Sequence, residues 1–413
     1  MRIVSSFALR NVSTEMRIRA QLSTCTSLDI AQFWNDVKNL STPLIAESNG
    51  IGKFYEVTFL WRSEKPLLSV YVRLNRVTDK RNVTRGLMTR IPSSDIWTLT
   101  LRLPATYRGS YSIIEIPQGT TPEQMTALGG RFSPLTGQSD PLNKAPSINS
   151  GSGVKESILS LKDAPEQNEW IDLQGTYSGK LISSYSLIAS RKRRIRTYFP
   201  DVANTIPLGL LVLPDAETWF DRIGVLEPID IAIKNGRISP IAVLGIDNLD
   251  ESDRSTILGG NSEFILNIVD NLIPQLRENC PDRVWAGRSK TVFAGQSLGG
   301  VSALMAALYA TETFGSIICH SPSMWWSPDR DTPPFRFTEN DISWISERVL
   351  SRPPKKVQIN LCVGSLEGTT VSHVQQLHQE LLASGVESIL SIYSGGHDYA
   401  WWRGALLDGL ATL

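Results

Sequence analysis

The sequence has little of several features that would point to particular classes of protein. Its 41 basic and 41 acidic residues cancel, so no net field favours nucleic acid or an anionic membrane as a partner. No apolar run approaches the length of a membrane span. The basic stretch 1–10 has an apolar core too short and too broken for a signal peptide, and Met16 is an alternative start. We therefore expect a cytoplasmic protein that binds neither nucleic acid nor membrane.

Cysteine and histidine are also scarce. The cysteines are scattered without pairing or metal-ligand spacing, which suits a reducing compartment and small buried side chains. They are Cys25, Cys280, Cys319 and Cys362. The chain has only 4 histidines, no His-Glu-x-x-His motif, and no histidines and carboxylates clustered at ligand spacing. A metallohydrolase is therefore disfavoured, and we expect neither a bound metal nor a cofactor.

One stretch organises what the chain does contain. Residues 291–300 (TVFAGQSLGG) combine a short buried strand with Gly-x-Ser-x-Gly, and an apolar helix follows over 301–308. This is the strand–turn–helix context of a nucleophile elbow. Gly295 and Gly299 are expected where side chains would collide with the neighbouring strand and helix. We predict that Ser297 is a nucleophile at the head of the helix; a plain tight turn is the alternative.

The first part of the chain is rich in β-strand patterns. Four segments alternate apolar and polar residues with a period near two, which predicts a small β-sandwich. These segments are residues 54–61, 68–74, 96–103 and 109–116. Helical spacing predicts a docked helix over 28–40. Residues 119–169 are dominated by Gly, Ser, Pro and Asn and are expected to form a long connector, with a domain boundary near 165. The predicted domains are therefore residues 28–165 and 166–413.

In the second part of the chain the apolar pattern changes, and stretches with helical spacing appear between the strands. Two extended stretches, 180–189 and 195–199, open this part, and the basic run 191–194 (RKRR) between them is expected to be an exposed hairpin tip. Strands and helices then alternate, which predicts a mostly parallel, doubly wound sheet with helices on both faces. Helices are expected near 218–225 and over 262–277. In such sheets ligands bind outside the carboxyl ends of the strands.

A serine nucleophile needs a base, and the base needs an orienting partner. His397 follows the last predicted strand, and paired glycines at 395–396 would let its loop bend over the strand ends. An α/β-hydrolase places its base late, in the order serine, acid, histidine. His320, at the end of the strand after the elbow, is the weaker candidate, and His373 and His378 lie inside a predicted helix.

Glu367 follows the penultimate strand and is the candidate acid, with an ordinary loop carboxylate as the alternative. Asp398 is assigned to turn capping because it is adjacent to His397. The predicted chemistry is acyl transfer: Ser297 attacks an ester carbonyl, His397 takes its proton, and Glu367 holds the imidazole. The oxyanion donors are expected in the backbone N–H of Leu298 and in the loop around Asp215 and Ala216.

Tryptophan and arginine follow several of the predicted strands. Trp325 and Trp326 lie beyond the strand that ends at His320, Trp402 follows His397, and Arg254 lies beyond another strand end. Buried tryptophans are the alternative interpretation. Together these residues favour an aromatic pocket, with an arginine placed for an anionic or catecholic ligand.

Motifs spread along the chain resemble those of the ferric enterobactin (enterochelin) esterases, within the esterase D-like α/β-hydrolases. In the first part they are residues 57–62 (VTFLWR), 95–97 (DIW), 107–111 (YRGSY) and 140–143 (DPLN). In the second part they are 254–255 (RS), 294–300 (AGQSLGG), 321–326 (SPSMWW), 395–398 (GGHD) and 402–404 (WRG).

The resemblance implies an α/β-hydrolase domain preceded by an immunoglobulin-like β-sandwich that helps enclose the substrate. It also implies a cytoplasmic enzyme that cleaves the trilactone of a catecholate siderophore, with iron carried by the substrate. Ser297 and His397 would be nucleophile and base, and Arg254 a pocket residue. Some members of this family are described as working with a Ser–His pair and no acid, which leaves the role of Glu367 open.

Two positions depart from the family pattern. Ile257 stands where Arg-x-x-Glu-Leu is expected, so no salt link through that position can orient Arg254. Asp215 is followed by Ala216 rather than glycine. These departures concern residues expected around the substrate rather than the nucleophile and the base that carry the reaction. The alternatives are a carboxylesterase of the same fold acting on an aryl or feruloyl ester, and a siderophore-binding protein without turnover.

Overall fold

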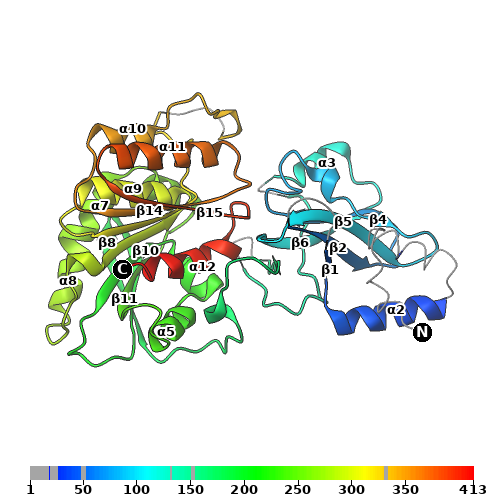
Figure 1. Ribbon diagram of the computed structural model, residues 1–413, viewed down its shortest axis with the longest axis horizontal. Helices are drawn as coiled ribbons and strands as arrows, with labels where there is room; N and C mark the ends of the chain where they lie inside the picture. Colours follow the sequence, from blue (N-terminus) through cyan, green and yellow to red (C-terminus); the bar gives the residue numbers. More distant parts are fainter. Residues whose placement is uncertain (1–17, 19–26, 48–52, 131–132, 150–153, 330–333) are drawn as a thin grey trace. The chain divides into compact units, whose positions relative to one another are not determined.

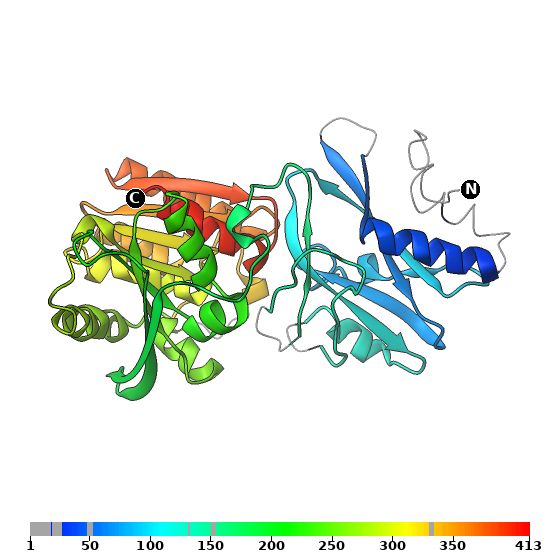
Figure 2. The ribbon, with the colours of Figure 1, turned by 90° about the horizontal axis from the view of Figure 1, so that it is seen from below.

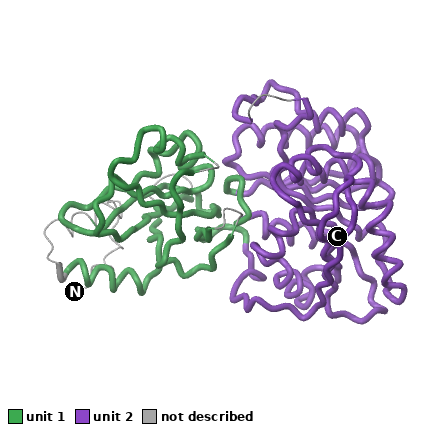
Figure 3. Tube along the Cα trace, turned by 180° about the vertical axis from the view of Figure 1, so that it is seen from behind, with its two compact units in different colours: residues 1–165, 394–400 green, residues 166–393, 401–413 purple. Residues whose placement is uncertain are grey.

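The structure is a computed structural model that describes residues 18, 27–47, 53–130, 133–149, 154–329 and 334–413 (Figure 1). The predictions for residues 1–10, Met16 and Cys25 lie outside this part. The chain forms two compact units (Figure 3). Unit 1 contains residues 1–165 and 394–400, and unit 2 contains residues 166–393 and 401–413. None of the described helices is long and apolar enough to cross a membrane.

Unit 1 contains two antiparallel sheets, which confirms the predicted β-sandwich. The four-stranded sheet has the order β1 (Leu44–Glu47), β2 (Phe54–Arg62), β5 (Ile96–Pro104), β4 (Thr89–Arg90). The three-stranded sheet has the order β3 (Leu67–Leu74), β6 (Arg108–Pro117), β7 (Ser157–Ser160). Residues of both sheets form one apolar core, in which the rings of Phe59 and Tyr111 meet edge to face at 5.0 Å.

The predicted N-terminal helix is confirmed as α2 (Ser27–Leu40) (Figure 2). Its apolar stripe places Phe33, Trp34 and Val37 in a second buried cluster with residues of the four-stranded sheet, among them Leu60. This cluster is separate from the sandwich core, so the helix covers a second apolar surface of the four-stranded sheet.

The interval 119–169 is more ordered than a connector. It contains the short helix α3 (Pro122–Ala127), which Thr121 caps, and the strand β7. An isolated bridge also pairs Ile148 with Glu156. A four-residue strand and single bridges are too short to produce a recognisable period, so the sequence could not reveal them.

Unit 2 has an eight-stranded sheet in the order β15-β14-β13-β12-β10-β11-β9-β8. Its strands are β8 (Lys180–Ile188), β9 (Arg191–Phe199), β10 (Gly209–Pro214), β11 (Ile241–Ile246), β12 (Thr291–Gln296), β13 (Ser316–His320), β14 (Gln358–Gly364) and β15 (Glu387–Tyr393). Strands β10 to β15 run parallel, and β9 and β8 add an antiparallel edge. This confirms the predicted doubly wound sheet, with its carboxyl ends at one edge.

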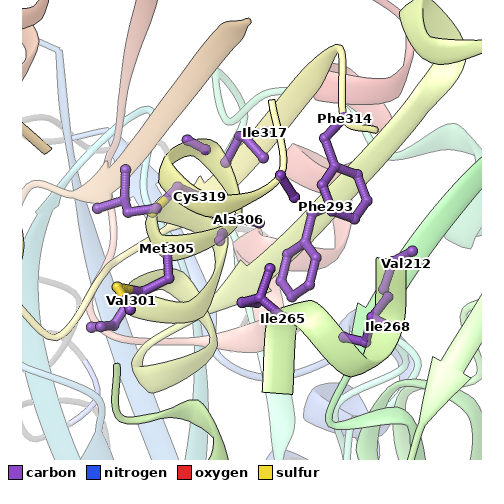
Figure 4. Close-up of a cluster of buried hydrophobic side chains, with 14 of the residues drawn as sticks. Val212, Ile265, Ile268, Phe293, Val301, Met305, Ala306, Phe314, Ile317 and Cys319 are labelled. Atoms are coloured by element: carbon purple, nitrogen blue, oxygen red, sulfur yellow. The ribbon is translucent and has the colours of Figure 1, made fainter. Parts of the chain in front are cut away.

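Helices cover both faces of this sheet. Figure 1 shows α9 (Leu298–Tyr309) and α11 (Thr369–Ala383) on one side and α5 (Leu226–Lys234) and α12 (Tyr399–Leu410) on the other. The remaining α-helices described in unit 2 are α4 (Ala216–Thr218), α6 (Glu251–Leu258), α7 (Ser262–Asn267), α8 (Ile273–Glu278) and α10 (Trp344–Ser351). In α9 every residue from Leu298 to Ala307 is buried. Figure 4 shows this helix packed in the core beside Phe293 and Phe314.

Two predicted helices are interrupted. The helix expected over 262–277 contains a π-helical turn, Ile268–Leu272, because Pro274 has no N–H to continue the ladder. The helix expected near 218–225 is a short π turn, Trp219–Ile223, that ends at Gly224 with φ 75°. The chain then starts a separate helix, α5, which the sequence did not predict.

The basic run is only partly an exposed hairpin tip: Arg191 and Lys192 are exposed, whereas Arg193 is buried. The β8–β9 turn is made by Ala189 and Ser190, at φ 47° and 62°, and Arg191 already belongs to β9. Arg193 has no exposed surface, and its Nη1 lies 2.7 Å from the Asp253 carboxylate near the start of α6. The composition of such a run predicts that its side chains are exposed to solvent. Side chains alternate between the two faces of β9, however, and this turns Arg193 inward to the buried carboxylate of Asp253.

Candidate active site

The nucleophile turn lies between β12 and α9. Ser297 has φ 58° and ψ −118°, a strained conformation for a residue with a side chain. The turn is held because Ser297 N donates to the carbonyl of His320 at 3.0 Å, and Ser323 N donates to the carbonyl of Ser297 at 3.0 Å. The Oγ atoms of Ser297 and Ser323 are 3.3 Å apart. The backbone therefore presents the hydroxyl at the carboxyl edge of the central strands.

Only one of the two flanking glycines is sterically required. A Cβ at Gly295 would overlap the backbone of Gly299, as predicted. A Cβ at Gly299 would meet only Asp215 Oδ2, at an ordinary 3.6 Å, so the collision expected there does not exist. The second crowded position is Gly300, whose Cβ would lie 2.9 Å from the Cα of Pro322. Close packing of α9 against the loop after β13 thus explains Gly300, but not Gly299.

The two predicted oxyanion donors occupy equivalent positions. Leu298 is the first residue of α9, and Ala216 is the first residue of α4. A backbone N–H at the start of a helix has no acceptor inside that helix, so it can serve a developing negative charge. Asp215, the residue before α4, adopts φ 57°, which turns the chain at the end of β10.

Asp215 is the centre of a buried hydrogen-bond network that the sequence did not predict. Its carboxylate, 2% exposed, accepts two bonds from Arg254, from Nε at 2.6 Å and Nη2 at 2.9 Å. It also accepts from Gln296 Nε2 at 2.6 Å and Asn248 Nδ2 at 2.6 Å. The network therefore fixes Arg254 to the loop that bears Ala216 and to the residue before Ser297.

The Asp215 network accounts for the departure from the family pattern at Ile257. The Ile257 side chain is 1% exposed and belongs to the apolar core, so it contributes no hydrogen bond to Arg254. The carboxylate that orients the guanidinium comes from Asp215, which follows β10 and lies outside α6. In the sequence, the only signal is an aspartate after a predicted strand, and that signal does not identify Arg254 as its partner.

Replacing Asp215 by alanine is expected to lower kcat/KM for an ester substrate by about 10- to 100-fold, because two charge-assisted hydrogen bonds that hold Arg254 are lost. Steady-state kinetics would measure the change. Asn248→Ala is the matched control, since it removes one neutral donor to the same carboxylate and leaves the ion pair in place. Equal kinetics for Asp215→Ala and wild type would show that Arg254 does not need this anchor.

Glu217 adds a second acid beside Asp215. It accepts from Asn248, from the side-chain Nδ2 at 2.8 Å and from the backbone N at 3.0 Å. Burial raises the pKa of Glu217, and the nearby charge of Asp215 raises it further. This part of the network therefore takes up a proton more readily than an ordinary glutamate.

Glu367, the candidate acid, is 4% exposed and follows β14. Its Oε1 accepts from Gly364 N at 2.8 Å and from Ser321 Oγ at 2.5 Å. The indole N–H of Trp402 donates to the same Ser321 hydroxyl at 2.9 Å. Glu367 is thus held rigidly at a strand end, and Trp402 contributes to holding it.

The predicted pocket tryptophans differ in exposure. Trp402 is 3% exposed, whereas Trp325 and Trp326 are half-buried beyond β13. Trp326 meets Trp344 edge to face at 5.1 Å. The two half-buried rings therefore follow the carboxyl end of β13, at the same edge of the sheet as Ser297. Trp402, in contrast, is a buried packing residue of α12.

Three of the four histidines have packing roles. His320 is fully buried, and burial lowers its pKa to about 3, so it stays neutral and is a poor base. His373 stacks on Phe337 with ring centroids 4.5 Å apart. His378 Nδ1 lies 2.9 Å from the hydroxyl of Ser388.

His397 lies in the segment 394–400, which belongs to unit 1. Its backbone N donates to Asn75 Oδ1 at 2.9 Å, and its carbonyl accepts from Asn75 Nδ2 at 3.1 Å. The neighbouring Asp398 accepts from Ala400 N at 2.8 Å, which is a turn-capping bond. The predicted nucleophile and the predicted base thus belong to different compact units.

A mostly parallel, doubly wound sheet whose central strand ends in a strained Gly-x-Ser-x-Gly turn is typical of a serine hydrolase of the α/β-hydrolase fold. Known families match both parts of the chain. The family described as "Enterochelin esterase, N-terminal" matches residues 56–170, and the family described as "Putative esterase" matches residues 186–413. The chain belongs to the enterochelin esterases.

Individual relatives agree with this assignment. The chain is 55% identical to the iron(III) salmochelin esterase of Escherichia coli O6:H1, over 96% of both chains. It is 27% identical to the iron(III) enterobactin esterase of Dickeya dadantii, over 92% of both. The crystal structure of ferric enterobactin esterase from Salmonella typhimurium matches with a TM-score of 0.77 and 27% identity, covering 92% of this chain and 98% of that one.

Proposed function

We propose that the chain is a cytoplasmic serine esterase that hydrolyses the trilactone ester bonds of a catecholate siderophore, such as enterobactin, in its ferric or iron-free form. The observation that carries the proposal is the strained Ser297 turn in a chain that matches a salmochelin esterase over 96% of its length. A solved relative at 25% identity, an enterobactin esterase from Shigella flexneri, was crystallised in the presence of enterobactin. The proposed reaction needs no resident cofactor, because the chain itself supplies the nucleophile, the base and the oxyanion donors; iron, when present, is part of the substrate.

In the proposed mechanism Ser297 Oγ attacks an ester carbonyl while His397 takes the hydroxyl proton. The tetrahedral oxyanion receives hydrogen bonds from the N–H groups of Leu298 and Ala216. Its collapse breaks the C–O bond, and His397 gives the proton to the leaving alkoxide. Water then attacks the acyl-enzyme by the same steps and releases the acid. Glu367 orients the imidazole.

Two observations support these roles. The other three histidines are buried or hydrogen-bonded in packing positions, which leaves His397 as the candidate base among the described residues. Glu367 is a buried carboxylate fixed by two donors at a strand end. Arg254 and the half-buried rings of Trp325 and Trp326 are proposed to bind the siderophore, whose catecholate arms are flat and whose ferric complex is anionic. Trp402, which the sequence also suggested for this role, is buried and donates to Ser321.

Chromatography of the products from enterobactin and salmochelin, each with and without iron, tests the proposal. We expect conversion of the cyclic trilactone to linear fragments by the wild type and none by Ser297→Ala. Intact trilactone together with fluorophosphonate labelling of Ser297 would instead indicate an esterase for another ester, such as an aryl or feruloyl ester. Intact trilactone without labelling would indicate a binding protein without turnover.

A further inference from the structure

The loop that carries His397 is held by side chains and backbone of the β-rich unit. Asn75, directly after β3, uses both ends of its side-chain amide on a single residue: Oδ1 accepts from His397 N and Nδ2 donates to His397 O. This pairing satisfies both backbone groups of His397, as a neighbouring strand would. Because one end must accept and the other must donate, the amide is specific for this arrangement.

Further contacts hold the loop on either side of His397. Arg108 N donates to the carbonyl of Ser394 at 2.9 Å, and the hydroxyls of Thr106 and Ser394 are 2.6 Å apart. Ser110 N donates to Asp398 Oδ2 at 2.6 Å. These partners lie on β6 or just before it, so the loop is bonded before and after His397.

Asn75 itself sits on a rigid turn. The next residue, Arg76, has φ 59°, and its N donates to Asp79 Oδ1 at 2.8 Å. The hydroxyl of Thr78 accepts from Leu74 N at 2.8 Å and donates to Val72 O at 2.6 Å. The Asn75 side chain is therefore presented from a fixed backbone, as a positioning group must be.

We propose that Asn75 is a positioning residue for the general base: it fixes the backbone of His397, which belongs to the same compact unit. The inference rests on the proposed function, in which His397 is the base. A loop with two glycines before His397 has many accessible conformations, and ordering it requires external bonds. Loss of the two hydrogen bonds from the Asn75 amide lowers the fraction of molecules in which the His397 imidazole is correctly placed.

The test compares Asn75→Ala with wild type on a siderophore ester and with a small neutral fluorophosphonate. We expect kcat and the rate constant of Ser297 phosphonylation to fall together by about 10- to 100-fold, with KM changed less than about threefold. Asn75→Asp keeps the acceptor for His397 N but loses the donor to His397 O. Its kcat should therefore lie between those of wild type and Asn75→Ala. Asn75→Asp also carries the test if the alanine variant does not fold.

Asn143→Ala is the matched control. Asn143 is also a half-buried amide of unit 1, and it donates to Tyr111 OH and to Ile158 O, both at 3.0 Å, rather than to the 394–400 segment. Its replacement should lower stability in urea but leave kcat unchanged. Equal losses of kcat in the two alanine variants, in proportion to stability, would overturn the inference.

His397→Ala separates this inference from the proposed function. If His397→Ala is inactive while Asn75→Ala has wild-type kcat and phosphonylation rate, the base assignment stands and the positioning role is wrong. If His397→Ala keeps wild-type activity, the base assignment itself is wrong, and the inference that rests on it fails with it.

Discussion

Replacing Ser297 by alanine is expected to lower kcat by about 10⁵- to 10⁶-fold, because the reaction loses its nucleophile while the oxyanion donors and the binding residues remain. The residual rate should still exceed that of the uncatalysed reaction for the same reason. Product chromatography under single-turnover conditions would measure the rate. Siderophore affinity, followed by quenching of tryptophan fluorescence, should change little.

Ser323→Ala is the control for this variant. Its hydroxyl lies 3.3 Å from that of Ser297, so the substitution removes a neighbouring serine from the same turn without removing the nucleophile. A neutral hydrogen bond contributes about 0.5–1.5 kcal/mol, so we expect a loss of no more than about tenfold. Activity of Ser297→Ala within about tenfold of wild type would contradict its assignment as the nucleophile.

The second large effect concerns stability. Asp253→Asn removes the charge that neutralises Arg193, whose side chain has no exposed surface. Breaking one side of a buried ion pair costs about 3–5 kcal/mol. Asp253 also precedes Arg254, so the pair holds the start of α6, from which Arg254 reaches Asp215. Urea denaturation followed by tryptophan fluorescence should show the unit 2 transition at a lower midpoint.

The loss of stability in Asp253→Asn should depend on pH. Burial alone raises the pKa of Asp253, but hydrogen bonds from Arg193 and from Leu249 N outweigh it, and the net pKa is lowered. A carboxyl with a lowered folded-state pKa contributes its stability above its unfolded value of about 3.9, and that contribution disappears as the pH falls through the folded pKa. Wild type and Asp253→Asn should therefore converge in acid.

Arg191→Ala is the matched control, since Arg191 contacts the same carboxylate at 3.3 Å from a side chain that is 53% exposed. An exposed pair contributes about 0–1 kcal/mol, so its removal should shift the urea midpoint little. A loss in Asp253→Asn no larger than that in Arg191→Ala would contradict the buried-pair argument.

The sequence predicts those parts of the molecule that repeat or carry a motif. The parallel sheet could be predicted because strands alternate with helices, and the sandwich because apolar residues alternate with polar ones. The Ser297 turn could be predicted because Gly-x-Ser-x-Gly follows a strand and opens a helix. The burial of Arg193 and the pairing of Asp215 with Arg254 are not visible. Each joins residues from distant parts of the chain, and a local pattern does not identify such partners.

The interruptions of the predicted helices have a different cause. Pro274 and Gly224 are visible in the sequence, but an apolar pattern continues through both and favours an unbroken helix. The role of Asn75 could not be predicted from the sequence, because 322 positions separate it from His397. Only the fold brings that amide to the histidine loop.

The grouping of residues 394–400 with the β-rich unit has a consequence for how such proteins can be recombined. A chimaera joined at residue 165 would inherit the loop with His397 from one parent and its partners, Asn75, Thr106, Arg108 and Ser110, from the other. A crossover there divides a set of mutually bonded residues although it falls between two compact bodies. Exchange of residues 1–165 among relatives should therefore succeed only when the 394–400 segment is exchanged with them, or when both parents have the same residues at these positions.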